Sequence, residues 1–148
     1  MKLSTKSDKI KVVLDTNIVV SALIAKQGSP AGIFEKLLEG KITCYSCKEI
    51  IEELIEVFGR KEITKRTDAK ARHFVIENYL KNSVKIQKKS EIKLSEHESD
   101  NKFIETAVDA EADYIVSGDQ HLLKLKKFMH IKILKPKEFL EVLSKKGS

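Results

Sequence analysis

The sequence has 148 residues, a length typical of a single domain that can bury its own hydrophobic core. Hydrophobic residues make up 41% and charged residues 34% of the chain, a composition that excludes a disordered or fibrous protein. The 28 Lys and Arg residues exceed the 22 Asp and Glu residues, so the formal net charge is +6. A basic surface favours polyanionic partners such as nucleic acid, but soluble proteins often carry such a charge for solubility, and charge alone leaves the partner open.

The ends of the sequence are polar, and the middle is the part that should fold. No apolar run approaches the roughly 20 residues that a membrane helix needs, so we expect a cytoplasmic protein without a membrane partner. We predict a flexible tail over residues 1–9, one domain over residues 10–143, and a second flexible tail over residues 144–148. Cys44 and Cys47 form a lone CxxC without further metal ligands, which favours two small apolar residues at a strand-to-helix junction over a zinc or redox site.

Apolar periodicity and turn residues divide the chain into alternating strands and helices. The predicted strands are Ile10–Leu14, Lys41–Tyr45, Val84–Gln87, Asp113–Ser117 and Ile131–Leu134. The predicted helices are Asn17–Ala25, Pro30–Glu39, Lys48–Phe58, Asp68–Lys81, Asp100–Ala110, Gln120–Lys127 and Pro136–Leu143, with a polar loop over Lys88–Ser99. The first strand, IKVVL, is apolar nearly throughout, as strands covered on both faces of a parallel sheet are. The alternation predicts an α/β fold with a mainly parallel sheet.

Two acidic residues follow predicted strands. Asp15 comes directly after the first strand, and Asp119 lies two residues past Ser117, where the fourth strand ends. Ligands of open α/β sheets bind beyond the carboxyl ends of the strands, so both residues are candidates for a binding site. Each also precedes a predicted helix, and for each acid a simple N-cap role is about as plausible as a functional one.

Two further acids stand out on predicted helices. On the helix Lys48–Phe58, Glu53 lies nearer the apolar arc than its acidic neighbours, although by itself it would be read as a surface residue. On the helix Asp100–Ala110, Asp100 falls near the middle of the buried arc, in the first turn. A carboxylate on a buried helix face is costly unless it is paired or bound to a cation, and the helix N-terminus is the alternative source of stabilisation. If all four acids are functional, Asp15, Glu53, Asp100 and Asp119 would lie at the same end of the sheet.

The segments around these acids resemble a known family. VVLDTNIVVSAL, EIIEELIEVF and SDNKFIETAVDAEADYIVSGDQHLL look like the successive motifs of the PIN-domain family, in particular its predicted toxin subfamily, over nearly the whole chain. The resemblance implies a Rossmann-like three-layer fold with a five-stranded sheet of order 3-2-1-4-5. It implies an acidic quartet at Asp15, Glu53, Asp100 and Asp119, with Thr16, Asn17, Ser117 and Asn101 in support. Family members often carry a further acid where this chain has His121, which we expect to be a surface residue, with a minor contact to phosphate as the alternative.

A cluster of carboxylates without His or Cys ligands suits Mg²⁺ or Mn²⁺. Because His121 stands where family members often have a further acid, we expect one tightly bound ion, with a second ion possible. The resemblance then implies a metal-dependent endoribonuclease, similar to VapC-like toxins of toxin-antitoxin pairs, with an antitoxin partner and a homodimeric state. An RNA-processing or repair nuclease without a toxin role would have the same site. A nucleic-acid-binding or interaction module without turnover is the alternative from a different class.

The RNA substrate would be held by basic side chains near the cleft. The residues that follow the Glu53 helix supply a basic patch that could contact it, consisting of Arg60, Lys61, Lys65 and Arg66. A solvated charged helix explains the same residues equally well. The sequence has no Trp and few aromatic residues, so recognition should depend on the RNA backbone more than on base stacking.

Overall fold

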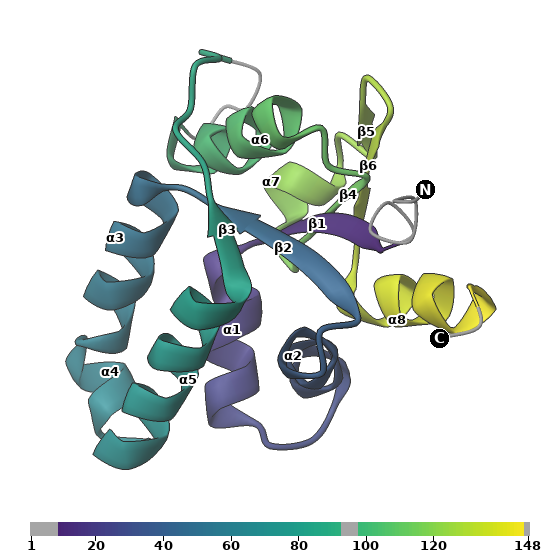
Figure 1. Ribbon diagram of the computed structural model, residues 1–148. Helices are drawn as coiled ribbons and strands as arrows, with labels where there is room; N and C mark the ends of the chain where they lie inside the picture. Colours follow the sequence, from purple (N-terminus) through teal and green to yellow (C-terminus); the bar gives the residue numbers. More distant parts are fainter. Residues whose placement is uncertain (1–8, 93–97, 147–148) are drawn as a thin grey trace.

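A computed structural model describes residues 9–92 and 98–146 of the chain (Figure 1). The strands are β1 (Ile10–Leu14), β2 (Ile42–Ser46), β3 (Ser83–Lys85), β4 (Tyr114–Val116), β5 (Lys127–Phe128) and β6 (Ile131–Leu134). The helices are α1 (Thr16–Ile24), α2 (Ser29–Leu38), α3 (Lys48–Phe58), α4 (Lys61–Thr64), α5 (Ala69–Asn82), α6 (Glu98–Ala110), α7 (Gln120–Leu123) and α8 (Pro136–Lys145). The predicted α/β alternation is confirmed.

The strands form one sheet of order β3-β2-β1-β4-β6-β5, parallel except for the β5–β6 pair. The predicted order 3-2-1-4-5 is right for the parallel strands, since the strand predicted at Ile131–Leu134 is β6 and lies beside β4. The predicted count of five strands is wrong, because β5 adds a short antiparallel edge strand. Parallel neighbours bring their carboxyl ends to the same edge, so the residues after β1 and β4 lie side by side.

Helices cover both faces of the sheet and make three layers (Figure 1). On one face, α1, α2, α5 and α8 pack against apolar side chains of β1 and β2. On the other face, α6 and α7 pack against β4 and β6. The alternation along β1 shows why it reads as continuously apolar: Val12 and Leu14 point to the first layer, whereas Val13 points to the second.

The segment between β4 and β6 differs most from the prediction. The helix predicted at Gln120–Lys127 ends at Leu123, and the chain turns into β5. Lys126 and Met129 have positive φ angles of 60° and 56°, a left-handed conformation that is incompatible with a continuing α-helix. Leu122, Leu123 and Leu125 all pack against the same face of the sheet, although the chain turns after Leu123. Their spacing in the sequence therefore resembles that of a longer helix.

Smaller differences lie at the ends of elements. The last helix continues to Lys145, two residues past the predicted end and into the predicted C-terminal tail, and the four-residue helix α4 was not predicted. Cys44 and Cys47 are both buried free thiols in β2 and at the N-cap of α3, as expected of small apolar residues at this junction. Residues 1–8, 147–148 and the part of the predicted polar loop at 93–97 lie outside the described residues. Within the described ranges, no helix is long and apolar enough to cross a membrane.

Candidate active site at the carboxyl ends of β1 and β4

Asp15 directly follows β1 and is buried, with 4% of its surface exposed. Its Oδ1 accepts a hydrogen bond from the backbone N–H of Asn17 at 3.2 Å, so it is the N-cap of α1. Its Oδ2 accepts a hydrogen bond from the Ser117 hydroxyl at 2.6 Å. The N-cap role therefore uses one carboxylate oxygen, and the second oxygen is held by a residue from the neighbouring strand. The cap alone does not explain why this side chain is tied to Ser117.

Ser117 connects the two strand ends. Leu14 pairs with Val116 in the sheet, and the backbone N–H of Asp15 donates to the Val116 carbonyl at 2.9 Å. The Ser117 hydroxyl, which donates to Asp15, also accepts from the backbone N–H of Asp119 at 2.9 Å. One buried hydroxyl thereby fixes both acidic loops relative to each other.

Asp119 is the N-cap of the short helix α7 and contacts His121. Its Oδ1 accepts from the backbone N–H of His121 at 2.9 Å and lies 3.1 Å from His121 Nδ1. Burial raises the pKa of Asp119, but these hydrogen bonds and the charge of His121 outweigh burial and hold the pKa below its usual range. His121 was expected to be a surface residue, and its side chain is 43% exposed, yet its ring partners Asp119.

Asp100 lies in the first turn of α6 and is 7% exposed, as the helical periodicity predicts. Burial raises its pKa from 3.8 to about 6, and the neighbouring carboxylates of Asp119 and Asp15 add to the rise. Asp100 and Asp119 are close enough for a hydrogen bond between their side chains, which favours the neutral form of Asp100 and the ionised form of Asp119. The proximity of the two carboxyl groups therefore raises the pKa of Asp100 and lowers that of Asp119.

Glu53 approaches the cluster from α3. Its Oε1 accepts from the Thr16 hydroxyl at 2.6 Å, and its Oε2 lies 3.3 Å from Lys102 Nζ. Glu53 is partly buried, whereas its neighbours Glu49, Glu52 and Glu56 are exposed, as predicted. The pKa of Asp15 is raised overall, mainly because the carboxyl group is buried. The charges of Glu53 and Asp119 add to the rise, and the hydrogen bonds from Ser117 and Asn17 oppose it. The four acids therefore form one electrostatic cluster.

Lys102 was missed by the sequence reasoning. Its side chain is 12% exposed, its Nζ lies 4.7 Å from the centre of the Phe103 ring, and its charge lowers the pKa of Asp100. On a helical wheel Lys102 lies about 200° from Asp100, so periodicity places it away from that carboxylate. Only the packing of α3 beside α6 brings Glu53 to Lys102.

Two of the supporting residues contact the acids by side chain. Thr16 and Ser117 are buried and each donates its hydroxyl to one of the acids. Asn17 is exposed and its backbone N–H donates to Asp15. Asn101 is buried beside Asp100 in α6. These placements agree with a role for Thr16 and Ser117 in fixing carboxylates.

The basic patch after α3 is only partly connected to this cluster. Arg60 makes two hydrogen bonds with Glu56, at 2.7 and 3.1 Å, which raise its pKa, and the Glu53 charge adds to the rise. Lys61, Lys65 and Arg66 are exposed on and beside α4. Arg60 therefore lies within electrostatic reach of Glu53, whereas the other three residues form a solvated surface.

The donor set fits a hard divalent cation, since the groups that meet here are carboxylate oxygens and a buried hydroxyl. Burial is the main cause of the raised pKa of Asp15 and Asp100, and the charges of the neighbouring carboxylates add to it, so a cation placed here would stabilise the ionised forms. As placed, however, no three His, Cys, Asp or Glu side chains in residues 9–92 and 98–146 form a group that could hold a metal ion. Lys102 pairs with Glu53 and His121 pairs with Asp119 in this arrangement, whereas the Ser117 hydroxyl orients Asp15.

Substitution of Ser117 by Ala should loosen this arrangement. Loss of the hydrogen bond to a buried carboxylate should lower the free energy of unfolding by about 1.5–3 kcal/mol. Metal affinity should fall about 10–100-fold, the usual cost of removing a residue that orients a metal ligand. Urea unfolding and Mn²⁺ calorimetry measure the two effects, with Ser144→Ala, at an exposed site in α8, as control. Equal Mn²⁺ affinity in Ser117→Ala and the wild type would refute this role.

Comparison with known proteins agrees with the geometry. The family model described as "PIN domain" matches residues 11–121, a range that contains all four acids. The chain is also 33% identical over 146 residues to the uncharacterized protein MJ1680 of Methanocaldococcus jannaschii, covering 93% of this chain and 94% of that protein. PIN domains generally bind divalent metal ions such as Mg²⁺ or Mn²⁺. The chain therefore belongs to the PIN-domain family, a family of generally metal-dependent nucleases.

Proposed function

We propose that this chain is an endoribonuclease that uses Mg²⁺ or Mn²⁺ to hydrolyse RNA phosphodiester bonds, and that it is the toxin of a type II toxin-antitoxin pair. The observation that carries the nuclease proposal is the meeting of Asp15, Glu53, Asp100 and Asp119 at the carboxyl ends of β1 and β4. The mutual repulsion of these buried and partly buried carboxylates has no structural benefit by itself, but it creates a preference for a divalent cation.

Asp15 and Asp100 would be direct ligands of the metal ion, because both are buried and their ionised forms lack sufficient compensation. Asp119 would be a direct or water-mediated ligand, and Glu53 would be a ligand or would orient the attacking water. When bound, the metal ion offsets charge on the scissile phosphate and activates water. Thr16 and Ser117 hold Glu53 and Asp15 in place by their hydroxyls. We expect one tightly bound ion, because His121 occupies the position of a further family acid.

The net positive charge of the chain favours a polyanionic substrate, for which we propose RNA. The acidic site itself would hold the metal ion. Arg60 lies near Glu53 and, with Lys61, Lys65 and Arg66, offers a basic surface to the RNA backbone. The test compares cleavage of a labelled single-stranded RNA and of DNA with the same sequence, in Mn²⁺. Cleavage of RNA alone supports the proposal. Equal cleavage of both would make the chain a nuclease without the proposed preference for RNA.

The toxin role and its partners rest on resemblance to the toxin subfamily. They predict growth arrest when the chain is expressed, relief of that arrest by a small antitoxin protein encoded beside it, and a homodimer in solution. Expression of the wild type and of Asp15→Asn in parallel separates toxicity from the burden of expression. Normal growth with active wild-type enzyme would favour an RNA-processing or repair nuclease.

A binding module without turnover is the second candidate, and it is favoured by one observation. Within the described ranges the side chains do not form a ready metal site, and Lys102 already pairs with Glu53. Calorimetric titration with Mn²⁺ distinguishes the candidates. A nuclease should bind one Mn²⁺ per chain and lose that binding in Asp15→Asn. RNA binding without Mn²⁺ binding or cleavage would establish the module.

Substitution of Lys102 by Met should strengthen metal binding. The ammonium group of Lys102 competes with a metal ion for Glu53 because it neutralises that carboxylate at 3.3 Å. Methionine keeps a long apolar side chain but removes the charge, and with it the contact between Nζ and the Phe103 ring. We expect Lys102→Met to raise Mn²⁺ affinity and to lower the stability of the metal-free protein, as measured by calorimetry and urea unfolding. Lys102→Arg, which keeps the charge, should resemble the wild type, and weaker Mn²⁺ binding in Lys102→Met would contradict this competition.

A further inference from the structure

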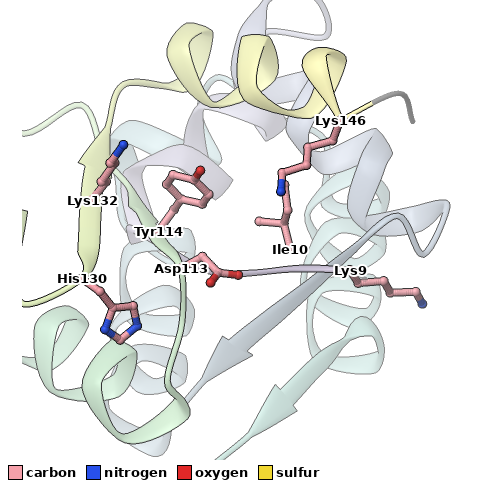
Figure 2. A pocket seen from close by; sticks show the side chains of 7 residues that line it. All are labelled: Lys9, Ile10, Asp113, Tyr114, His130, Lys132 and Lys146. Atoms are coloured by element: carbon pink, nitrogen blue, oxygen red, sulfur yellow. The ribbon is translucent and has the colours of Figure 1, made fainter. Parts of the chain in front are cut away.

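A second site lies at the opposite end of the sheet from the acid cluster. A pocket of about 300 Å³ opens at the amino ends of β1, β4 and β6, beside the end of α8 (Figure 2). We call it the amino-end pocket. Its lining residues are Lys9, Ile10, Asp113, Tyr114, His130, Lys132 and Lys146. Its volume is at the lower end of the range for small-molecule sites, large enough for a ligand of about mononucleotide size.

The amino-end pocket is strongly basic. Lys9, His130, Lys132 and Lys146 line it, and none of these four side chains has an ion-pair partner among the described residues. The elements that bring them together are far apart in sequence, since Lys9 precedes β1, Lys132 lies in β6 and Lys146 follows α8. A pocket that gathers positive charge from three elements without neutralising it favours an anionic ligand.

Asp113 is the one acid in the lining, and it is engaged in the sheet. Its Oδ2 accepts from the backbone N–H of Lys11 at 2.9 Å, and its own N–H donates to the Lys11 carbonyl at 2.8 Å. The carboxylate therefore belongs to the connection between β1 and β4. It reduces the positive charge of the pocket by one unit. The Lys9 side chain points away from the other lining residues (Figure 2), so Lys132, Lys146 and His130 remain as potential donors.

Tyr114 adds a fixed hydroxyl. Its ring packs edge-on against Phe139, with ring centres 5.8 Å apart and planes at 64°. Tyr114 lines the pocket, and its phenol oxygen has no hydrogen-bond partner in the parts of the chain that the structure describes. Lys146 and Tyr114 reach the pocket from α8 and β4 (Figure 2). The pocket thus presents more donors than acceptors, which matches a phosphate group with its acceptor oxygens.

The amino-end pocket is separate from the acid cluster. Ile10 begins β1 and Asp15 follows its end, so five residues of extended strand, roughly 16 Å, lie between the two sites. A phosphate bound at one site cannot contact the other. The pocket also does not depend on a metal ion, because its lining is cationic.

We propose that the amino-end pocket binds a phosphate monoester of mononucleotide size, either a free nucleotide or the 5′-phosphorylated end of an RNA. Lys132 and Lys146 supply the charge, and the Tyr114 hydroxyl donates a hydrogen bond to a phosphate oxygen. The two sources share the same chemistry and differ in the chain attached to the phosphate. This proposal stands independently of the proposed nuclease activity.

The test is calorimetric titration of the full chain with AMP in EDTA, so that phosphate cannot bind through a metal at the acid cluster. Adenosine tests whether the phosphate is needed, and a short RNA with a 5′-phosphate, compared with the same RNA bearing a 5′-hydroxyl, tests the second source. Lys132→Gln/Lys146→Gln should weaken binding at least about tenfold, and Tyr114→Phe should weaken it less. Lys70→Gln/Lys81→Gln, which removes the same charge from exposed positions of α5, is the matched control.

Binding of AMP or of the 5′-phosphorylated RNA that is lost in Lys132→Gln/Lys146→Gln and kept in the control supports the pocket. Three results would overturn it: neither ligand binds, adenosine or the 5′-hydroxyl RNA binds equally well, or the control double variant weakens binding as much. The last result would identify a general effect of net charge. Because all titrations contain EDTA, failure here leaves the nuclease proposal untouched, and an inactive acid cluster leaves this pocket untouched.

Discussion

Substitution of Asp100 by Asn should lower RNA cleavage by at least about 100-fold at saturating Mn²⁺. Asparagine has nearly the same shape and keeps the buried position in the first turn of α6, but it cannot supply a carboxylate. The proposed ligand role needs that charge, and the hydrogen bond with Asp119 cannot replace it. The measurement is the single-turnover rate on a labelled single-stranded RNA, with Mn²⁺ affinity determined in parallel.

The control for this prediction is Glu52→Gln. Glu52 lies beside Glu53 on α3 but is exposed, so its loss removes one negative charge without entering the cluster. Glu52→Gln should cleave RNA at nearly the wild-type rate. If Asp100→Asn also cleaved at that rate, Asp100 would not be a metal ligand, and its burial would need another explanation.

The same Asp100→Asn substitution should stabilise the metal-free protein above pH 6. The folded wild type keeps a proton on Asp100 up to a pKa of about 6, whereas the unfolded chain loses it near 3.8. Between these values the folded state binds more protons, so the free energy of unfolding falls as the pH rises, by about 2–3 kcal/mol in total. Asn cannot ionise and avoids this loss. Part of the gain is offset because a charge in the first turn of a helix is favourable.

Urea unfolding of both proteins in EDTA at pH 4 and pH 7.5 measures this effect. The two should have similar stability at pH 4, where Asp100 is mostly neutral, and the variant should be the more stable at pH 7.5. The low pKa of Asp119 acts below this range and does not reverse the difference. Added Mn²⁺ should stabilise the wild type more than the variant. A variant less stable than the wild type at pH 7.5 in EDTA would show that the Asp100 carboxylate is already compensated.

Much of the fold could be predicted because its signals are local. The apolar run of β1, the turn before Pro30 and the periodicity of α3 each fix an element within a residue or two. The hairpin of β5 and β6 could not be predicted in this way, because the left-handed residues Lys126 and Met129 carry no glycine to mark the turn. Its pairing depends on a contact with β6 that the sequence of Lys127–Phe128 does not specify.

The placement of the four acids could be predicted in outline for similar reasons. A buried position for Asp100 follows from the 3.6-residue period of its own helix, and proximity of Asp15 to Asp119 follows from strand order. The pairing of Lys102 with Glu53 depends on two helices that are 49 residues apart in sequence, and no local pattern encodes it. The partnership of His121 with Asp119 arises in the cap of a four-residue helix that was predicted to be longer.

The most direct test is the rate at which the purified chain cleaves a labelled single-stranded RNA in Mn²⁺, in EDTA, and after Mn²⁺ is restored. A metal-dependent nuclease centre built from Asp15, Glu53, Asp100 and Asp119 predicts cleavage in Mn²⁺, none in EDTA, and recovery on restoration. It also predicts that Asp15→Asn and Asp100→Asn remain inactive under all three conditions. Cleavage that persists in EDTA, or that survives both substitutions, would contradict the assignment of these carboxylates as the catalytic centre.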